Sequence, residues 1–294
     1  MTRECVSSRR RRSGGFVGFV CFVVAAALAV AAPARAQSQL EDAPSVPNAL
    51  RESARSVLEH AFDNLYGCDV REDLEIEARV DGEVVRRHKL RLLRKTVNGR
   101  VMMLVRFVTE NDSWDTRVLK VENEDRSDDQ FVWMPALGRV RRFTSVQKAD
   151  PFQGTDLTLE DIEVHRARRF EILGRAYSVL QGEPVHVLTI APMYELGYRR
   201  AILFISQKDY AVLEVHYYRG DDARRPYKVS RAPRDQMAEA GGHVLPLLLI
   251  FTDYEHGTET WARYHRRSVV DDLDDKLFSL DLLESDDWPR AFTR

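Results

Sequence analysis

The residue types that could carry catalysis are scattered along the chain and form no recognised catalytic arrangement. The sequence contains no G-x-S-x-G elbow, no H-E-x-x-H motif, no C-x-x-C pair and no glycine loop of the kind that binds phosphate. Its eight histidines do not fall at metal-ligand spacings. An acidic run at 271–275 could bind a cation, but a solvated turn explains it better. We therefore expect no enzymatic activity, no cofactor and no metal site.

The densest charge pattern follows a predicted tight turn at Pro135–Gly138. Arg139, Arg141 and Arg142 come directly after this turn, on the return strand of a predicted hairpin. They place three positive charges close together on a chain that is otherwise acidic. This stretch is the most informative part of the sequence.

A long irregular connection comes next, from Thr144 to Asp156. It has neither a strand nor a helix pattern, and such segments in compact domains are usually functional or mobile. Thr158 and Asp161 then match the spacing of a capping box. The pattern predicts one short turn of helix at Leu159–Val164.

Strands account for most of the remaining chain. Asn48 is a plausible N-cap, and apolar residues at helical spacing predict one helix over Ala49–Tyr66. The period then changes to two, and Asp81-Gly82 and Asn98-Gly99 predict hairpin turns. Further strands are predicted up to Arg267, including one at His243–Tyr254. About a dozen antiparallel strands with one N-terminal helix indicate a mainly β fold built on one large, strongly curved or nearly closed sheet.

Two predicted strands, Ala201–Ile205 and Leu247–Phe251, are apolar on both faces. A strand of this kind must be covered on both sides. One explanation is an ordinary two-layer core with a helix on one face. The other is a sheet that wraps around an apolar cavity, and composition alone leaves both open.

The first 36 residues read as a cleavable signal peptide. Arg9–Arg12 precede an uncharged apolar run over Phe16–Ala32, and Pro33–Ala36 supplies the small residues of a cleavage site. A membrane anchor is the alternative, but the run is short for a bilayer span and ends at this site. We expect export from the cytoplasm with cleavage near Ala36.

The rest of the chain is predicted to be a flexible leader at 37–48 and a single domain at 49–294. The signal peptide holds six of the 44 basic residues but only one of the 46 acidic ones, so the exported part is acidic. Nucleic acid is therefore an unlikely partner. Cys68 is the one cysteine outside the signal peptide, which excludes an internal disulfide, and we expect it to be a small buried hydrophobic residue.

The segment from Trp133 to Asp161 contains a W-x-P-A-L-G-R-V-R-R turn and a following F-x-G-T-D-L-T-x-E-D segment. With these two motifs the chain resembles the outer-membrane lipoprotein-sorting proteins, the periplasmic relatives of the LolA and LolB carriers. The resemblance extends more weakly over Ala49–Leu283. The expanded segment Ala232–Gly242 departs from the family pattern, as does Leu159, where members often carry an aromatic residue.

The resemblance implies an incomplete β-barrel with an apolar interior, closed by the helix at Leu159–Val164 as a plug. It further implies that Arg139, Arg141 and Arg142 hold an anionic headgroup, although pairing with Asp156 and nearby acids is the alternative. Asp156 itself is expected to be structural. Candidate cavity-lining residues are Met103, Val105, Phe107, Trp133, Leu203 and Leu248.

The function that the resemblance implies is a periplasmic carrier of a lipid or an acylated protein. The expected partner is an exporter of the RND type or an outer-membrane acceptor, and the expected state is a monomer. Two alternatives remain at this point: an envelope sensor or regulatory module with the same fold, and a periplasmic hydrolase.

Overall fold

The computed structural model describes residues 52–108, 116–124, 126–143, 151, 154–161, 164–220 and 224–285. All of these residues belong to one compact unit. The predicted signal peptide, the predicted leader at 37–48 and the N-cap Asn48 lie outside the described residues. None of the helices in the described ranges is both long enough and apolar enough to cross a membrane.

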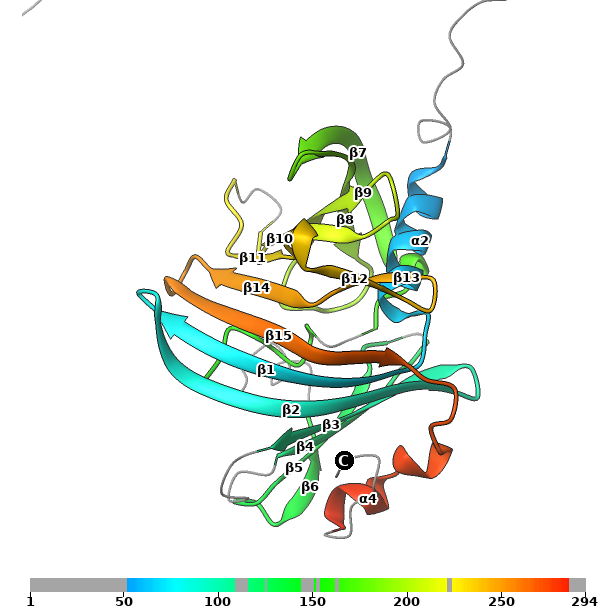
Figure 1. The fold of residues 1–294 in the computed structure, drawn as a ribbon, viewed down its shortest axis with the longest axis vertical. Helices are drawn as coiled ribbons and strands as arrows, with labels where there is room; N and C mark the ends of the chain where they lie inside the picture. Colours follow the sequence, from blue (N-terminus) through cyan, green and yellow to red (C-terminus); the bar gives the residue numbers. More distant parts are fainter. Residues whose placement is uncertain are drawn as a thin grey trace, which may run out of the picture. The chain divides into compact units, whose positions relative to one another are not determined.

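Thirteen of the described strands form one antiparallel sheet (Figure 1). The strands follow each other across the sheet in the order β6-β5-β4-β3-β2-β1-β15-β14-β11-β10-β9-β8-β7. Their bounds are β1 Val70–Val80, β2 Glu83–Val97, β3 Arg100–Val108, β4 Arg117–Val121, β5 Asp129–Met134, β6 Arg139–Arg142, β7 Phe170–Leu180, β8 Glu183–Pro192, β9 Arg200–Ser206, β10 Val212–Tyr218, β11 Lys228–Arg231, β14 Leu248–Asp253 and β15 Thr258–Val269. Because β6 and β7 are edges that do not pair, the predicted large, unclosed antiparallel sheet is confirmed.

Turn chemistry fixes the register of the first hairpins. Asp81 and Gly82 both have positive φ, at 51° and 82°, and Asn98 and Gly99 have φ of 50° and 77°. Positive φ at both central positions is the geometry of a two-residue turn whose twist matches that of the flanking strands. Both hairpin predictions are therefore confirmed.

The N-terminal helix, α2 at Ala54–Tyr66, begins five residues later than the sequence pattern predicts. Ser53 is its N-cap, because its side chain accepts a hydrogen bond from the backbone N–H of Ser56 at 3.0 Å. One face of α2 packs on β8 and β9 in a cluster of buried residues. This cluster comprises Val57, Leu58, Ala61, Phe62, Ala167, Phe170, Leu188, Ile190, Tyr198, Ala201, Leu203 and Ile205.

The prediction of one continuous strand over His243–Tyr254 is wrong. The chain forms β13 at His243–Pro246, which pairs with β12 at Met237–Ala240 in a separate two-stranded sheet, and then enters the large sheet as β14. Leu247 makes the change, because its N–H donates to Gln236 while its carbonyl accepts from Tyr264 of β15. Strand β12 was not predicted at all.

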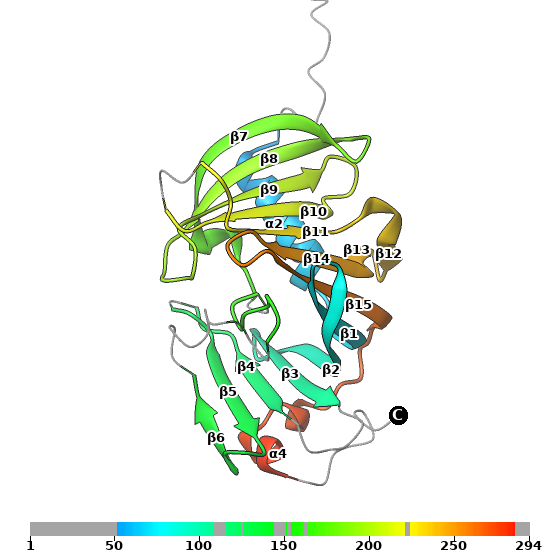
Figure 2. The same cartoon turned by 90° about the vertical axis from the view of Figure 1, so that its left-hand side faces the viewer.

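The two faces of the large sheet are covered by different segments. The inner face carries α2 and the described part of the connection between β6 and β7. The outer face of β2–β5 carries the C-terminal helix α4 at Leu280–Glu284 and the residues before it. β6 and β7 lie at opposite edges of the sheet but are consecutive strands in the chain, and the described part of the connection between them lies on the inner face (Figure 2).

Candidate functional site

The turn at Thr158–Asp161, which we call the plug turn, is fastened to the inner face of the sheet. Leu159 packs in the cluster formed by β1–β5, and its carbonyl accepts a hydrogen bond from the side chain of Gln130 at 2.8 Å. The Asp161 carboxylate accepts from the backbone N–H of Thr158 at 2.7 Å and from its hydroxyl at 3.0 Å. This is the predicted capping contact. Of the predicted helix at 159–164, residues 162 and 163 lie outside the described ranges, and Leu159–Asp161 are in a turn.

One ion pair connects the plug turn to the opposite half of the sheet. Lys228, the first residue of β11, places its Nζ 2.7 Å and 2.8 Å from the two carboxylate oxygens of Asp161. The two side chains are only 5% and 7% exposed. A pair this well shielded from water is weakened little by salt, and removal of either partner leaves a buried charge without compensation.

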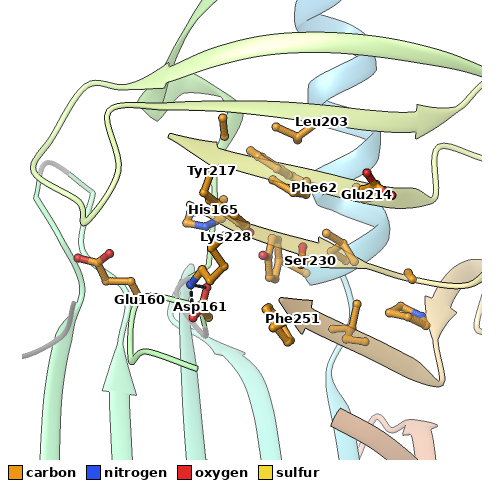
Figure 3. A pocket seen from close by; sticks show the side chains of 18 of the residues that line it. Phe62, Glu160, Asp161, His165, Leu203, Glu214, Tyr217, Lys228, Ser230 and Phe251 are labelled. Carbon is orange, nitrogen blue, oxygen red and sulfur yellow. Dashed lines mark hydrogen bonds and ion pairs between the residues drawn. The ribbon is translucent and has the colours of Figure 1, made fainter. Parts of the chain in front are cut away.

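A cavity of about 170 Å³ lies beside this ion pair on the inner face (Figure 3). Residues of α2, the plug turn and the inner face of the sheet line it, among them Phe62, Tyr217 and Phe251. The cavity is similar in size to an engineered cavity of about 150 Å³ that holds benzene. It is smaller than the roughly 300–1,000 Å³ of typical ligand pockets. With the plug turn in place, the cavity therefore has room for a few carbon atoms and not for a whole acyl chain.

The lining combines apolar side chains with tyrosines and paired charges. Burial raises the pKa of Tyr66, Tyr217 and Tyr264, so their hydroxyls remain protonated hydrogen-bond donors. Arg267 donates to Glu72 at 2.6 Å, and their side chains are 8% and 2% exposed. The charges of Arg267 and Glu72 are thus compensated by each other rather than by water.

The structure brings four of the six predicted cavity residues to one face. Met103 and Leu203 line the cavity. Val105 and Phe107 lie in the cluster that packs against Leu159 of the plug turn. The remaining two, Trp133 and Leu248, do not line the cavity.

Trp133 and Leu248 occupy positions of their strands whose side chains point away from the cavity. Trp133 packs in the outer cluster, where the guanidinium of Arg117 lies 4.0 Å from the centre of its ring. Leu248 is buried, but its neighbour Leu249 is the β14 residue that lines the cavity. Adjacent residues of a strand point to opposite faces, so the cavity contact falls to Leu249.

The three predicted headgroup arginines are exposed on β6 and are not part of the cavity lining. Arg142 pairs with Asp129 of β5, with Nε and Oδ1 2.8 Å apart. No ion pair of Arg139 or Arg141 occurs among the described residues. A headgroup role for these arginines remains a prediction.

Asp156 is held by the threonines of β15. Its carboxylate accepts hydrogen bonds from Thr258 and, at 2.8 Å, from Thr260. These bonds fasten the chain before the plug turn to the sheet. The contacts favour the structural role expected for Asp156.

Sequence analysis missed the polar members of the site, Lys228 and Arg94. Their signal was present, because β2 alternates Leu90, Leu92 and Arg94 at its inward positions, so the arginine stands where an apolar residue is expected. Lys228 opens a strand whose inward neighbour is Ser230. A cation at an inward position of a strand is a candidate for a partner or a ligand.

A second buried charge cluster lies on β4, β5 and the segment before β7. Asp128 and Lys120 are both 0% exposed, and the Lys120 Nζ lies 3.1 Å from an Asp128 carboxylate oxygen. Arg169 approaches the other oxygen at 3.2 Å. His165 lies nearby and also lines the cavity, and burial lowers its pKa to about 4. These contacts join the segment after the plug turn to the sheet.

Cys68 is half buried and packs against the cluster under the plug turn, close to the burial expected for it. Burial raises the pKa of its thiol, against the opposing effect of the nearby Arg94. Since the thiolate is the reactive form, we expect iodoacetamide to modify Cys68 about tenfold more slowly in the folded protein than in urea at pH 8. Mass spectrometry over time measures both rates, and equal rates would show an accessible, unperturbed thiol.

Within the described ranges, no group of three or more histidine, cysteine or acidic side chains is placed to hold a metal ion.

Comparison with known proteins identifies the family and the fold. A family model described as "Uncharacterized protein"-like matches residues 99–285. No curated protein sequence matches the chain. Several solved structures share its fold, and three of them illustrate the similarity. The first is a domain from Vibrio parahaemolyticus named as an outer membrane lipoprotein-sorting protein, with a TM-score of 0.69 and 21% identity, which covers 81% of this chain and 100% of its own.

The second is a DUF1329 family protein from Desulfovibrio piger, with a TM-score of 0.70, 20% identity and coverage of 78% and 98%. The third is a LolA superfamily protein from Nitrosomonas europaea, with a TM-score of 0.62, 19% identity and coverage of 79% and 100%. The chain therefore belongs to the family described as "Uncharacterized protein", and it has the fold of the lipoprotein-sorting and LolA superfamily proteins that its sequence resembles.

Proposed function

We propose that this protein is a periplasmic carrier that binds the acyl chain of a lipid or of a lipid-modified protein and catalyses no reaction. The observation that carries the proposal is the cavity on the inner face of the sheet, lined in part by the plug turn, which a buried ion pair joins to β11. The fold shared with proteins named for lipoprotein sorting supports it. The signal peptide predicted at residues 1–36 supports the periplasmic location.

The size of the cavity determines how such a carrier would load. A space of about 170 Å³ accepts only the end of a hydrocarbon chain while the plug turn is in place. Loading therefore requires the plug turn to leave the inner face, which extends the cavity toward the cluster of Met103, Val105 and Phe107. The contacts that must break include the Lys228–Asp161 pair, the Gln130–Leu159 hydrogen bond and the hydrogen bond from the Gly197 N–H to Glu160.

The energetics favour direct transfer to a partner. Burying a methylene group stabilises by about 0.8 kcal/mol, so a chain of about sixteen carbons gains on the order of 12 kcal/mol before any cost of opening. Release of such a chain into water would be slow. We therefore propose transfer within a complex with an RND-type exporter or an outer-membrane acceptor, with the carrier itself a monomer.

The substitution Leu203→Trp tests the cavity directly. Leu203 is 3% exposed and lines the cavity, so a larger ring at this position fills the space that the hydrocarbon would occupy. We expect the affinity for a fluorescent fatty acid to fall by about tenfold or more. Fluorescence titration of the purified exported protein measures this affinity, and mass spectrometry of an organic extract identifies any lipid already bound.

Leu173→Trp is the matched control, because Leu173 on β7 is 52% exposed and can accept the ring in solvent. It should leave the affinity unchanged. Equal losses for the two variants would show that the cavity is not where the probe binds. Absence of extracted lipid together with no binding to the wild-type protein would contradict the carrier function itself.

A further inference from the structure

The cavity lining contains a cation that has no counter-ion among the described residues. Arg94 of β2 is 4% exposed and lines the cavity. Its hydrogen bonds within the described residues go to Cys68: Nη2 lies 3.4 Å from the carbonyl, and the guanidinium also contacts the thiol, so neither partner is a carboxylate. Its Nε is buried without a partner, and its guanidinium carbon lies 5.7 Å from the centre of the Tyr66 ring.

The other charges of the lining have partners. Lys228 pairs with Asp161, and Arg267 pairs with Glu72. Glu214 accepts from Arg231 at 3.0 Å. Glu160 accepts from the backbone N–H of Gly197 at 2.8 Å. A buried arginine that lacks a carboxylate is costly, so its position in the cavity indicates that the compensating negative charge comes from a ligand.

We propose that Arg94 is an anion subsite inside the cavity and that the cargo is a single-chain monocarboxylate, of the chemical class of long-chain free fatty acids. This inference rests on the proposed carrier function. The planar guanidinium can donate two parallel hydrogen bonds to a carboxylate. The charge of Arg94 acts on the hydroxyls of Tyr66 and Tyr264, so both protonated hydroxyls lie near the proposed position of the carboxylate.

Size and charge favour a carboxylate over a larger or more highly charged headgroup. With the plug turn back in place after loading, the cavity of about 170 Å³ accommodates a carboxylate and the first methylenes at one end of the chain but leaves no room for a glycerophosphate headgroup. The lining includes the acids Glu72, Glu160, Asp161 and Glu214. One unpaired guanidinium neutralises one negative charge, so a second charge on the ligand would face these acids without compensation.

The test compares ligands that share a sixteen-carbon chain and differ in their head. Palmitate, hexadecanol and hexadecyl phosphate displace a neutral naphthylamine dye from the exported protein, below their micellar concentrations. We expect the wild-type protein to bind palmitate about ten- to a hundredfold more tightly than hexadecanol, as charge-assisted hydrogen bonds predict. Hexadecyl phosphate should bind more weakly than palmitate.

Arg94→Met should abolish the preference for palmitate while hexadecanol binds within about twofold of wild type. Arg94→Lys keeps the charge but loses the planar guanidinium that can donate two parallel hydrogen bonds, so it should keep part of the preference. Arg91→Met is the matched control, because Arg91 lies on the same strand with its side chain on the other face, paired with Asp73 at 2.8 Å. This control should keep the full preference.

Thermal melting separates a binding role from a structural one. Removal of a buried charge that lacks a partner should leave the Tm of Arg94→Met at or above that of wild type. A clearly lower Tm would show that Arg94 holds the fold together and would overturn the proposal. Retained palmitate preference in this variant, or equal wild-type binding of palmitate and hexadecanol, would also overturn it.

Three outcomes separate a failure of this inference from a failure of the carrier function. Tighter binding of hexadecyl phosphate than of palmitate would assign the subsite to a phosphate headgroup and overturn the carboxylate. If the wild-type protein binds the neutral and the anionic ligands equally well, the carrier function stands and this inference fails. If it binds none of the three, both fail.

Discussion

Replacing Lys228 with methionine should destabilise the protein by about 3–5 kcal/mol and speed the entry of a hydrophobic probe. Among the described residues, the substitution leaves the Asp161 carboxylate, 7% exposed, with hydrogen bonds to Thr158 alone. Its negative charge then lies in a poorly solvated site without the cation that compensates it. Because Asp161 belongs to the plug turn, its unpaired charge weakens the attachment of this turn to the sheet beside the cavity.

The measurements are the Tm and the rate of dye uptake in stopped flow. For a domain of this size the loss corresponds to a decrease in Tm of about 10 °C. The double variant Lys228→Met/Asp161→Asn removes both charges but keeps the side chain that can accept from the Thr158 N–H, and it should recover most of the lost stability. Recovery would show that the unpaired charge, and not the lost methylenes, causes the effect.

The control is an exposed ion pair. Arg219 and Glu255 lie 3.1 Å apart with side chains 52% and 45% exposed. Arg219→Gln should therefore change the stability by less than about 1 kcal/mol and leave the uptake rate unchanged. A Lys228→Met variant as stable as this control, with wild-type uptake, would show that the pair does not fasten the plug turn.

Local sequence signals predicted the elements of this fold well. The Asp81-Gly82 and Asn98-Gly99 turns and the period-two alternation in β1 are properties of neighbouring residues, and the structure confirms them. The pairing of β1 with β15 has no such signal, because it joins residues almost 200 positions apart, such as Glu72 and Arg267. The resemblance to a known family, rather than periodicity, indicated that the sheet remains open.

The candidate site was less predictable for a related reason. In a strand that is apolar on both faces, the sequence does not show which alternate residues point inward. A shift of one residue in the assignment exchanges the two faces. This is why Leu248 was predicted to line the cavity where Leu249 does so. Lys228 and Asp161 meet only because the described part of the connection between β6 and β7 lies on the inner face, which no local pattern encodes.

The second large effect is expected from Asp128→Asn in the buried cluster of β4 and β5. Asp128 and Lys120 are 0% exposed and Arg169 is 5% exposed, so the substitution leaves two cations without their common carboxylate. We expect a loss of about 3–5 kcal/mol in the free energy of unfolding at pH 7. Urea denaturation measures it, and the double variant Asp128→Asn/Lys120→Met should be more stable than the single one.

The pH dependence gives an independent check on the same cluster. Burial by itself raises the pKa of Asp128, but the charges of Lys120 and Arg169 outweigh it and hold this pKa below its ordinary value of 3.8. A depressed carboxyl pKa contributes stability above the unfolded pKa, and this contribution is lost as the pH falls through the folded pKa. His165, whose pKa burial lowers to about 4 from 6.5, acts in a different window: the unfolded chain takes up a proton between these values, so stability falls there first.

The wild-type protein should therefore lose stability in two stages, between about pH 6.5 and pH 4 and again below about pH 4. Asp128→Asn should keep the first stage and weaken the second, because its amide does not titrate. His165→Gln should do the reverse. Urea midpoints measured from pH 3 to pH 7 distinguish the variants, and a second stage of full size in Asp128→Asn would show that the ion pairs of Asp128 are not the source of acid sensitivity.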